Sequence, residues 1–283
     1  MEYVTLNNGV LMPAVGFGVF QINDHDQCVQ SVLDAIECGY RLIDTAQSYG
    51  NEKAVGEALR KTNVAREDLF ITTKVWISNA GYDKAYQSIL KSMDDLGVSY
   101  IDCVLIHQPL NDVYGTYRAM TQLYNEGKIR AIGVSNFYPD RLADFAMCND
   151  IIPTINQIEV NPFHQQLKAL EINEKFGVCV QAWAPFAEGQ HDIFNNPVLA
   201  SIGSRVGKTN AQVILRWLMQ RNIVPLAKTV NKSRMKENLD IFDFSLTEED
   251  MSLIATLNTD KSSFFDHQTP EAVERLLSLV RNV

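Results

Sequence analysis

Three titratable residues stand at the ends of separate apolar runs in this sequence. Asp44 follows Leu-Ile, Lys74 follows Ile-Thr-Thr, and His107 follows Val-Leu-Ile. Such runs are typical of buried strands, and a polar or charged side chain at the end of a buried strand needs a partner. If the strands are parallel neighbours in a barrel, their carboxyl ends meet at one rim. The sequence therefore predicts that an aspartate, a lysine and a histidine share one site.

Tyr49 supplies a candidate proton donor for the same site. It lies in the loop between Asp44 and the next predicted helix. A free phenol has a pKa of about 10, and an adjacent ammonium, for which Lys74 is the candidate, lowers that pKa by stabilising the phenolate. Asp44 would keep Lys74 charged, and His107 could hydrogen-bond a substrate oxygen. We therefore expect a site that donates a proton and contains no nucleophile.

Each of these residues also has an ordinary structural interpretation. Asp44 and Lys74 can form a simple buried ion pair, a lone histidine is commonly a satisfied core residue, and loop tyrosines are frequent. Taken singly, the structural interpretation is favoured. Their joint placement after consecutive strands favours the functional one.

The elements that must position these residues alternate between strand and helix. This alternation is typical of parallel strands joined by crossover helices. Gly16-Phe17-Gly18 lacks the third glycine of the G-x-G-x-x-G motif of doubly wound dinucleotide-binding folds, so we predict an α/β fold of the (β/α)8 TIM-barrel type. The predicted strands span residues 41–44, 69–75, 101–107, 129–135, 155–159, 178–184 and 222–226, and the predicted helices span 52–61, 82–96, 113–126, a stretch from Pro139, 166–176, 211–221, 247–257 and 271–280.

The barrel is expected to carry additions at both ends of the chain. Residues 6–10 resemble a hairpin turn, because Asn8-Gly9 suits the positive φ angles of a type I′ turn, and this N-terminal β-hairpin could plug one end of the barrel. The last two predicted helices are extra C-terminal helices. Because such a barrel typically occupies about 250 residues, residues 1–283 are expected to form a single domain.

Charge and composition disfavour several classes of function. The formal net charge of −9 repels phosphate backbones and anionic lipids. The first residues have no basic or apolar leader, and no segment approaches about 18 consecutive apolar residues. The 5 cysteines form no C-x-x-C pair, which indicates reduced thiols. We expect a cytoplasmic monomer with no nucleic-acid or membrane partner.

Four sequence segments resemble the aldo-keto reductase superfamily, and the likeness extends over essentially the whole chain. It is strongest to bacterial members related to diketogluconate reductases. The resemblance implies a catalytic tetrad of Asp44, Tyr49, Lys74 and His107, and NADPH-dependent reduction of aldehyde or ketone carbonyls to alcohols with Tyr49 as the general acid. The segments are residues 39–46, 49–52, 73–76 and 105–107.

The resemblance also implies where NADPH binds. Ser135, Asn136 and Gln157 should hydrogen-bond the nicotinamide carboxamide, and Trp183 should stack on the nicotinamide. Without the resemblance, Ser135-Asn136 reads as a helix cap, and Trp183 reads as a core residue. The remaining implied cofactor contacts are Gly18, Asp44, Ala184 and Phe186, together with Lys228, Thr229, Val230, Arg234, Glu237 and Asn238 for the adenosine 2′-phosphate and adenine.

Two regions depart from the family pattern. Ala227 replaces a common proline before Lys228, and Thr229 replaces a serine but keeps the hydroxyl. Phe20 and Gln108 stand where relatives often carry tryptophan. Together with Trp76, Tyr49 and His107 these two residues are expected to line the substrate mouth.

Two other functions are compatible with a barrel of this kind. One is a non-catalytic barrel that binds NADPH as a sensor or structural subunit. The other is a metal-assisted hydrolase that uses His107 and Asp44. No metal is required by the reductase scheme, and the sequence lacks closely spaced His or Cys ligand sets. The physiological carbonyl substrate is not readable from the residues, because loops and residues 264–267 shape the pocket.

Overall fold

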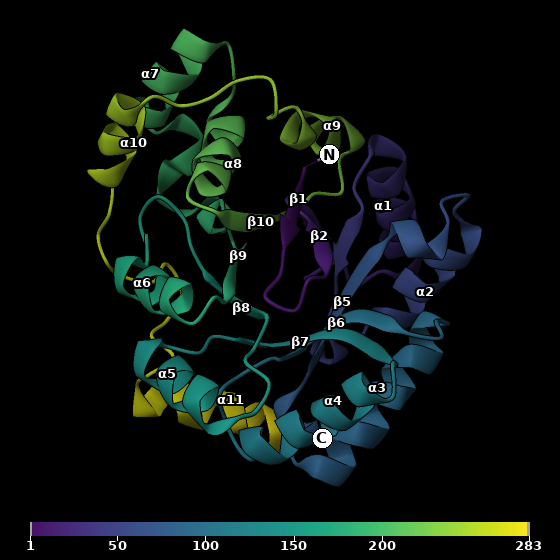
Figure 1. Ribbon diagram of the computed structural model, residues 1–283. Helices are drawn as coiled ribbons and strands as arrows, with labels where there is room; N and C mark the ends of the chain where they lie inside the picture. The colour runs from purple at the N-terminus through teal and green to yellow at the C-terminus, as the bar shows by residue number, and fades with distance from the viewer. Residues whose placement is uncertain (1, 282–283) are drawn as a thin grey trace.

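The protein folds into a closed barrel of parallel strands surrounded by helices (Figure 1). The computed structural model describes residues 2–281. The strands close in the order β10-β3-β4-β5-β6-β7-β8-β9, which is the predicted (β/α)8 fold. The barrel strands are β3 (Gly16–Gly18), β4 (Leu42–Asp44), β5 (Phe70–Val75), β6 (Ile101–Ile106), β7 (Ile129–Ser135), β8 (Ile155–Glu159), β9 (Cys179–Trp183) and β10 (Ile223–Ala227).

Helices connect the strands and cover the outside of the barrel. Their ends show the capping expected from local chemistry: the Asp24 carboxylate accepts a hydrogen bond from the Gln27 amide before α1, and Gly39 adopts a φ of 114° after it. None of the helices within residues 2–281 is long and apolar enough to cross a membrane. The helices are α1 (His25–Cys38), α2 (Glu52–Lys61), α3 (Tyr82–Leu96), α4 (Val113–Asn125), α5 (Pro139–Cys148), α6 (Leu167–Lys175), α7 (Pro197–Val206), α8 (Asn210–Gln220), α9 (Lys232–Leu239), α10 (Glu248–Ala255) and α11 (Pro270–Arg281).

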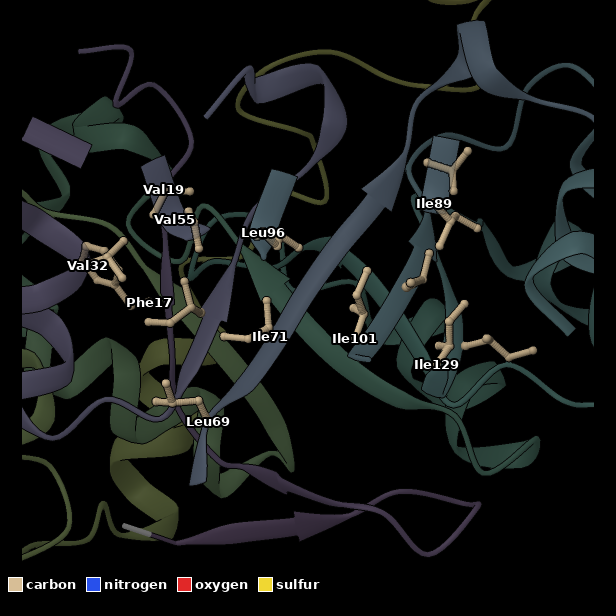
Figure 2. Packing of buried hydrophobic residues seen from close by; sticks show 14 of the residues in the cluster. Phe17, Val19, Val32, Val55, Leu69, Ile71, Ile89, Leu96, Ile101 and Ile129 are labelled. Carbon is tan, nitrogen blue, oxygen red and sulfur yellow. The ribbon is translucent and has the colours of Figure 1, made fainter. Parts of the chain in front are cut away.

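The strands bury both of their faces, in two different apolar layers. Figure 2 shows part of the outer layer, in which Val32 of α1 and Val55 of α2 lie near Phe17 of β3, and Ile89 of α3 lies towards Ile101 of β6. The inner layer fills the barrel with a separate set of residues. Because successive side chains of a strand point to opposite faces, each strand supplies both layers. Members of the inner layer are Leu42, Phe70, Cys103, Leu105, Ala131, Ile155, Val224 and Leu226.

An N-terminal hairpin closes one end of the barrel, as predicted. Its strands β1 (Tyr3–Thr5) and β2 (Leu11–Pro13) pair antiparallel, and Leu6 and Met12 pack into the inner apolar layer. The side-chain amide of Asn7 donates to the Pro153 carbonyl at 3.0 Å, just before β8. The hairpin therefore covers the end at which the strands begin and leaves the opposite rim to the site.

The predicted type I′ turn in this hairpin is wrong. Gly9 has a φ of 84°, but Asn8 is not among the residues with positive φ. The Gly9 amide donates to the Leu6 carbonyl, and the Leu6 amide donates to the Val10 carbonyl, each at 2.9 Å. This is the pattern of a type I turn followed by a left-handed glycine bulge. This loop has one residue more than a type I′ hairpin, so only Gly9, and not Asn8, adopts the left-handed conformation.

Left-handed residues also shift several predicted boundaries. Asn222 has a φ of 58°, so β10 begins one residue later than predicted and includes Ala227. Ala184, with a φ of 46°, ends β9 one residue early, and Gln166, with a φ of 56°, delays the start of α6. The predicted elements do not include β3, α1, α7 and α9; in β3 two of three residues are glycine, which carries no strand propensity. The single-domain prediction extends to Met1, Asn282 and Val283, which lie outside the described residues.

Candidate active site

The alternation of side chains along the barrel strands brings the predicted residues together. Asp44 pairs in register with Thr72 across β4 and β5, and Lys74 pairs with Leu105 across β5 and β6. With Leu42 and Leu105 on the inner face, the two-residue period places Asp44 and His107 on that face as well. The rim therefore collects the inward side chains at the carboxyl ends of several strands.

Lys74 is fully buried and uses all three of its N–H groups. Its Nζ donates to Asp44 Oδ2 at 2.6 Å, to the Thr45 carbonyl at 2.9 Å and to the Tyr49 hydroxyl at 3.2 Å. Its relative exposure is 0%, and the Asp44 side chain is 6% exposed. An ammonium has three donors, so the buried charge is completely satisfied. The predicted contact between Lys74 and Tyr49 is present, as is the ion pair with Asp44.

The pKa of Tyr49 shifts opposite to the direction expected from the sequence. Burial of the phenol raises its pKa above the ordinary value of 10.0, and this effect outweighs the lowering by the Lys74 ammonium, while Asp44 raises the pKa further. For Lys74, burial lowers the pKa, but the attraction of Asp44 and Tyr49 leaves it raised. The predicted lowering of the phenol pKa by Lys74 is present, but desolvation, which the prediction left out, outweighs it. At neutral pH the pair consists of a phenol and an ammonium.

His107 is neutral at neutral pH. Burial lowers its pKa well below 6.5, and the charges of Lys74 and His267 add to this effect. Its Nδ1 lies 3.3 Å from Ser48 Oγ, and its ring meets Tyr49 edge-on with ring centroids 5.6 Å apart. A neutral imidazole has one donor and one acceptor nitrogen. The tautomer in which Ser48 Oγ donates to Nδ1 would carry its proton on Nε2.

An amide and hydroxyl network extends from the tetrad along the rim. Gln157 Nε2 donates to Asp44 Oδ1 at 2.9 Å, and Ser135 Oγ donates to the Gln157 carbonyl at 2.8 Å. Asn136 Nδ2 donates to the His107 carbonyl at 3.1 Å, and Trp183 Nε1 donates to Asn136 Oδ1 at 2.9 Å. All predicted carboxamide-binding residues therefore lie beside the tetrad and already have fixed orientations.

Open space adjoins this network on the β3 and β9 side. A Cβ added to Gly18 would meet no atom within 4 Å, and Gly18 pairs with Asp44 in register. Ala184 and Phe186 follow Trp183 in the loop after β9, and all three are partly exposed. The backbone at Gly18 therefore leaves open space next to Asp44.

The segment predicted to bind the 2′-phosphate lies at the start of α9. Lys228, Val230 and Arg234 are exposed, and neither Lys228 nor Arg234 forms an ion pair within residues 2–281. Asn231 Oδ1 accepts from the amides of Ser233 and Arg234 and so caps the helix. Because the cap occupies those amides, phosphate recognition would depend on the two cationic side chains rather than on the helix start.

The other three predicted residues of this segment differ in their surroundings. Thr229 Oγ1 accepts from the Asn231 amide at 3.1 Å, and Glu237 Oε1 accepts from Thr209 Oγ1 at 2.8 Å. Asn238 is 4% exposed. Thr229 and Glu237 thus stabilise the local fold. The residues present fit a phosphorylated dinucleotide, since free cations lie at one end of the rim and an amide network at the other.

The predicted substrate residues contact the tetrad from outside. Phe20, which is 48% exposed, has its ring centroid 4.9 Å from that of Tyr49, and Trp76 meets His107 edge-on at 5.0 Å. Gln108 is different, since it is 7% exposed and its Oε1 is buried without a hydrogen-bond partner. Phe20 and Trp76 are therefore partly exposed side chains that pack on the tetrad, whereas Gln108 is buried.

Sequence reasoning missed the residues that hold the C-terminal strap, which we define as residues 258–269. Glu159, at the end of β8, accepts from Ser262 Oγ at 2.6 Å and from the Ser263 amide at 2.9 Å. The strap then places Phe264 against Trp183, with ring centroids 5.3 Å apart. No local pattern links Glu159 to a serine 103 residues later. Only proximity in space reveals this contact.

These features define a (β/α)8 barrel with Asp44, Lys74 and Tyr49 joined by hydrogen bonds at its carboxyl rim, beside an amide network. The aldo/keto reductase family model matches residues 14–259, and the chain belongs to this family of oxidoreductases. Glyoxal reductase of Bacillus subtilis (strain 168) is 43% identical over 261 residues, which cover 92% of this chain and 94% of that protein.

Solved structures of relatives agree with this assignment. An aldo-keto reductase from a Medee basin deep-sea metagenome library has a TM-score of 0.92 and 39% identity, covering 94% of this chain and 98% of that chain. A Bombyx mori aldo-keto reductase in complex with NADP has a TM-score of 0.90 and 32% identity, covering 96% of this chain and 98% of that one. The predicted family and fold are confirmed.

Proposed function

We propose that this protein is an NADPH-dependent reductase of aldehyde or ketone carbonyls, with Tyr49 as the general acid. The observation that carries the proposal is the saturation of Lys74. Its three N–H groups have three acceptors, one of which is the Tyr49 oxygen. Because the phenol oxygen accepts from Lys74, its own proton remains free to be donated to a substrate oxygen.

His107 presents the carbonyl to Tyr49. Its neutral imidazole donates from Nε2 while Ser48 occupies Nδ1, so the substrate oxygen receives two hydrogen bonds. Both donors strengthen their interaction as negative charge develops on that oxygen. Tyr49 then transfers its proton, and Lys74, held by Asp44, stabilises the resulting phenolate until it is protonated again.

NADPH would lie along the rim, with the 2′-phosphate at Lys228 and Arg234 and the carboxamide at Ser135, Asn136 and Gln157. When bound, it supplies the hydride that reduces the carbonyl carbon. Trp183 would cover one face of the nicotinamide and leave the other to the substrate. Gly18, Asp44, Ala184 and Phe186 line the space between the two ends, and Thr229, Val230, Glu237 and Asn238 shape the adenosine end.

The same proposal covers the domain organisation, oligomeric state, location and partners of the protein. Residues 1–283 act as one domain and as a monomer in the cytoplasm, without a nucleic-acid or membrane partner. A metal-assisted hydrolase has no support, because no three His, Cys, Asp or Glu side chains converge within the described residues. A non-catalytic NADPH-binding barrel is opposed by the complete tetrad and would require absence of turnover across a broad panel of carbonyls.

The general-acid role is tested by Tyr49→Phe. We expect kcat for benzaldehyde or methylglyoxal to fall by roughly 100-fold or more, with NADPH binding by fluorescence unchanged. Tyr40→Phe is a matched control, because the Tyr40 hydroxyl is buried and has no hydrogen-bond partner. Its removal should leave turnover intact. Full activity of Tyr49→Phe would remove Tyr49 from the mechanism.

A further inference from the structure

We propose that Gln47 is a positioning residue for the reduction, because its side-chain amide ties the loop that carries Tyr49 to the loop that carries Trp76 and to α3. The inference rests on the proposed reductase function and deepens it. The Tyr49 loop is residues 45–51, between β4 and α2, and the Trp76 loop is residues 76–81, between β5 and α3. Gln47 acts on the tetrad through these loops and not by contact with a ligand.

The Tyr49 loop has little backbone structure of its own. Its centre is the single 3-10 turn Gln47–Tyr49. The Tyr49 amide donates to the Ala46 carbonyl at 3.0 Å, and the Gly50 amide donates to the Gln47 carbonyl at a longer 3.4 Å. Hydrogen bonds in such short turns have poor geometry. The place of the Tyr49 phenol therefore depends on side chains that attach the turn to its neighbours.

The Gln47 amide makes four hydrogen bonds to two other segments. Its Oε1 accepts from the Trp76 backbone amide at 3.0 Å and from Asn79 Nδ2 at 2.9 Å. Its Nε2 donates to Ser88 Oγ at 3.1 Å and to Ser92 Oγ at 3.2 Å. A backbone amide can only donate, so the Trp76 contact fixes which end of the side chain is oxygen. With two donors and two acceptor positions used, the amide has nothing left to offer a substrate or cofactor.

The two serines are themselves held within α3. Ser88 Oγ donates to the Ala85 carbonyl at 3.0 Å, so its oxygen is free to accept from the amide. Ser92 is 1% exposed. Burial raises the pKa of Glu52, and hydrogen bonds from Thr73 and Ser92 oppose this rise. Thr73, directly before the tetrad lysine, donates to Glu52 Oε1 at 2.6 Å. A network therefore runs behind the tetrad from the amide, through α3 and the start of α2, to β5.

The two loops joined by Gln47 both place a ring against His107. Tyr49 meets His107 edge-on with ring centroids 5.6 Å apart, and Trp76 meets it edge-on at 5.0 Å. None of the four bonds of the Gln47 amide goes to a member of the tetrad. A misplacement of about 1 Å can cost about 100-fold in rate. Loss of the amide should therefore slow proton transfer from Tyr49 without removing any reacting group.

Gln47→Met tests the inference, because methionine keeps the length of the side chain and removes all four hydrogen bonds. With NADPH saturating, we expect kcat/KM for methylglyoxal to fall roughly tenfold or more. KM for NADPH should change by less than about twofold, because the predicted cofactor contacts lie elsewhere on the rim. Gln122→Met is the matched control, since Gln122 is exposed on α4 and its amide donates to Glu126. The same chemical change there should leave both constants at the native value.

Gln47→Glu separates positioning from a merely structural role. A carboxylate has the shape of the amide and keeps both acceptor bonds to the Trp76 loop. We expect kcat/KM to return to within about threefold of the native value, because the bonds that hold this loop survive. Urea unfolding records the stability of both variants. A merely structural role would lower the free energy of unfolding and leave the kinetic constants of the folded enzyme unchanged.

The outcomes distinguish this inference from the reductase function. Native kcat/KM in folded Gln47→Met would overturn the inference and leave the reductase function standing. So would a fall that Gln47→Glu does not reverse, or equal losses in kcat/KM and in affinity for NADPH, because either would show general damage to the rim. Absence of turnover of both methylglyoxal and benzaldehyde by the native protein would overturn the reductase function together with this inference.

Discussion

The two ends of the rim are built on opposite principles. At the tetrad, Lys74 is 0% exposed and its donors are all satisfied by the protein itself. At the adenosine end, Lys228 and Arg234 are exposed and form no ion pair within the part of the chain that the structure describes. In the proposed function, the proton-donating group is preorganised at the cost of buried charge, whereas the cations proposed for the 2′-phosphate stay open to solvent until a ligand arrives.

The largest effect is expected where the buried pair is broken. Lys74→Met leaves Asp44 without its cation, and because removing one partner of a buried pair strands a charge, the free energy of unfolding should fall by about 3–5 kcal/mol. Urea unfolding followed by circular dichroism measures this. Asp44→Asn combined with Lys74→Met should recover much of the stability but none of the turnover. Equal stability of the single variant and the native protein would show that the pair is not desolvated.

At the exposed end, loss of a cation should affect cofactor choice and not folding. Arg234→Ala is expected to raise KM for NADPH by roughly tenfold, or about 1.4 kcal/mol, and to leave KM for NADH unchanged. Lys236→Ala, an exposed change on the same helix, is the control. Steady-state kinetics with both cofactors measure the effect. Equal shifts for NADPH and NADH would mean that Arg234 does not contact the 2′-phosphate.

On the buried side, the strap contact can be weakened without touching the tetrad. Glu159→Gln loses the charge on the bonds to Ser262 and Ser263, so KM for an aldehyde should rise several-fold while kcat and KM for NADPH change little. The coupling with Ser262→Ala should reach about 1 kcal/mol in a double-mutant cycle. Thr259→Val, which alters the strap where Thr259 Oγ1 donates to the Phe163 carbonyl, is the control. If the effects of Glu159→Gln and Ser262→Ala on KM were strictly additive, Glu159 would not be coupled to the strap.

The smallest effect concerns the response of the strap to pH. The pKa of His267 falls from 6.5 to about 4 on burial, with Asp266 opposing the shift. The unfolded chain therefore takes up the proton first, so stability contributed by His267 is full above pH 6.5 and is lost as the pH falls towards 4. Between pH 7 and pH 5, His267→Asn should lose less stability than the native protein in urea unfolding. An equal loss of stability in His267→Asn and the native protein would show that His267 is solvated in the folded state.

Local pattern located the barrel strands other than β3 and indicated a shared site for Asp44, Tyr49, Lys74 and His107, and the family resemblance then decided in favour of a catalytic tetrad. Asp44, Lys74 and His107 each end an apolar run. Because successive side chains of a strand point to opposite faces whatever the strand packs against, the face on which each of these residues lies can be predicted from the run alone. The rim network at Ser135, Asn136 and Gln157 came from the family resemblance rather than from chemistry legible in the residues. β3 escaped prediction because its glycines carry no strand pattern.

Short-range periodicity and parallel connection were thus enough to predict that Asp44, Lys74 and His107 meet at the rim. The tertiary structure decided the direction of the Tyr49 pKa shift, because desolvation by surrounding segments outweighs one neighbouring charge. It also decided the turn of the hairpin and the contact of Glu159 with the strap. These features depend on backbone conformation and on distances between segments far apart in the chain, which no local pattern encodes.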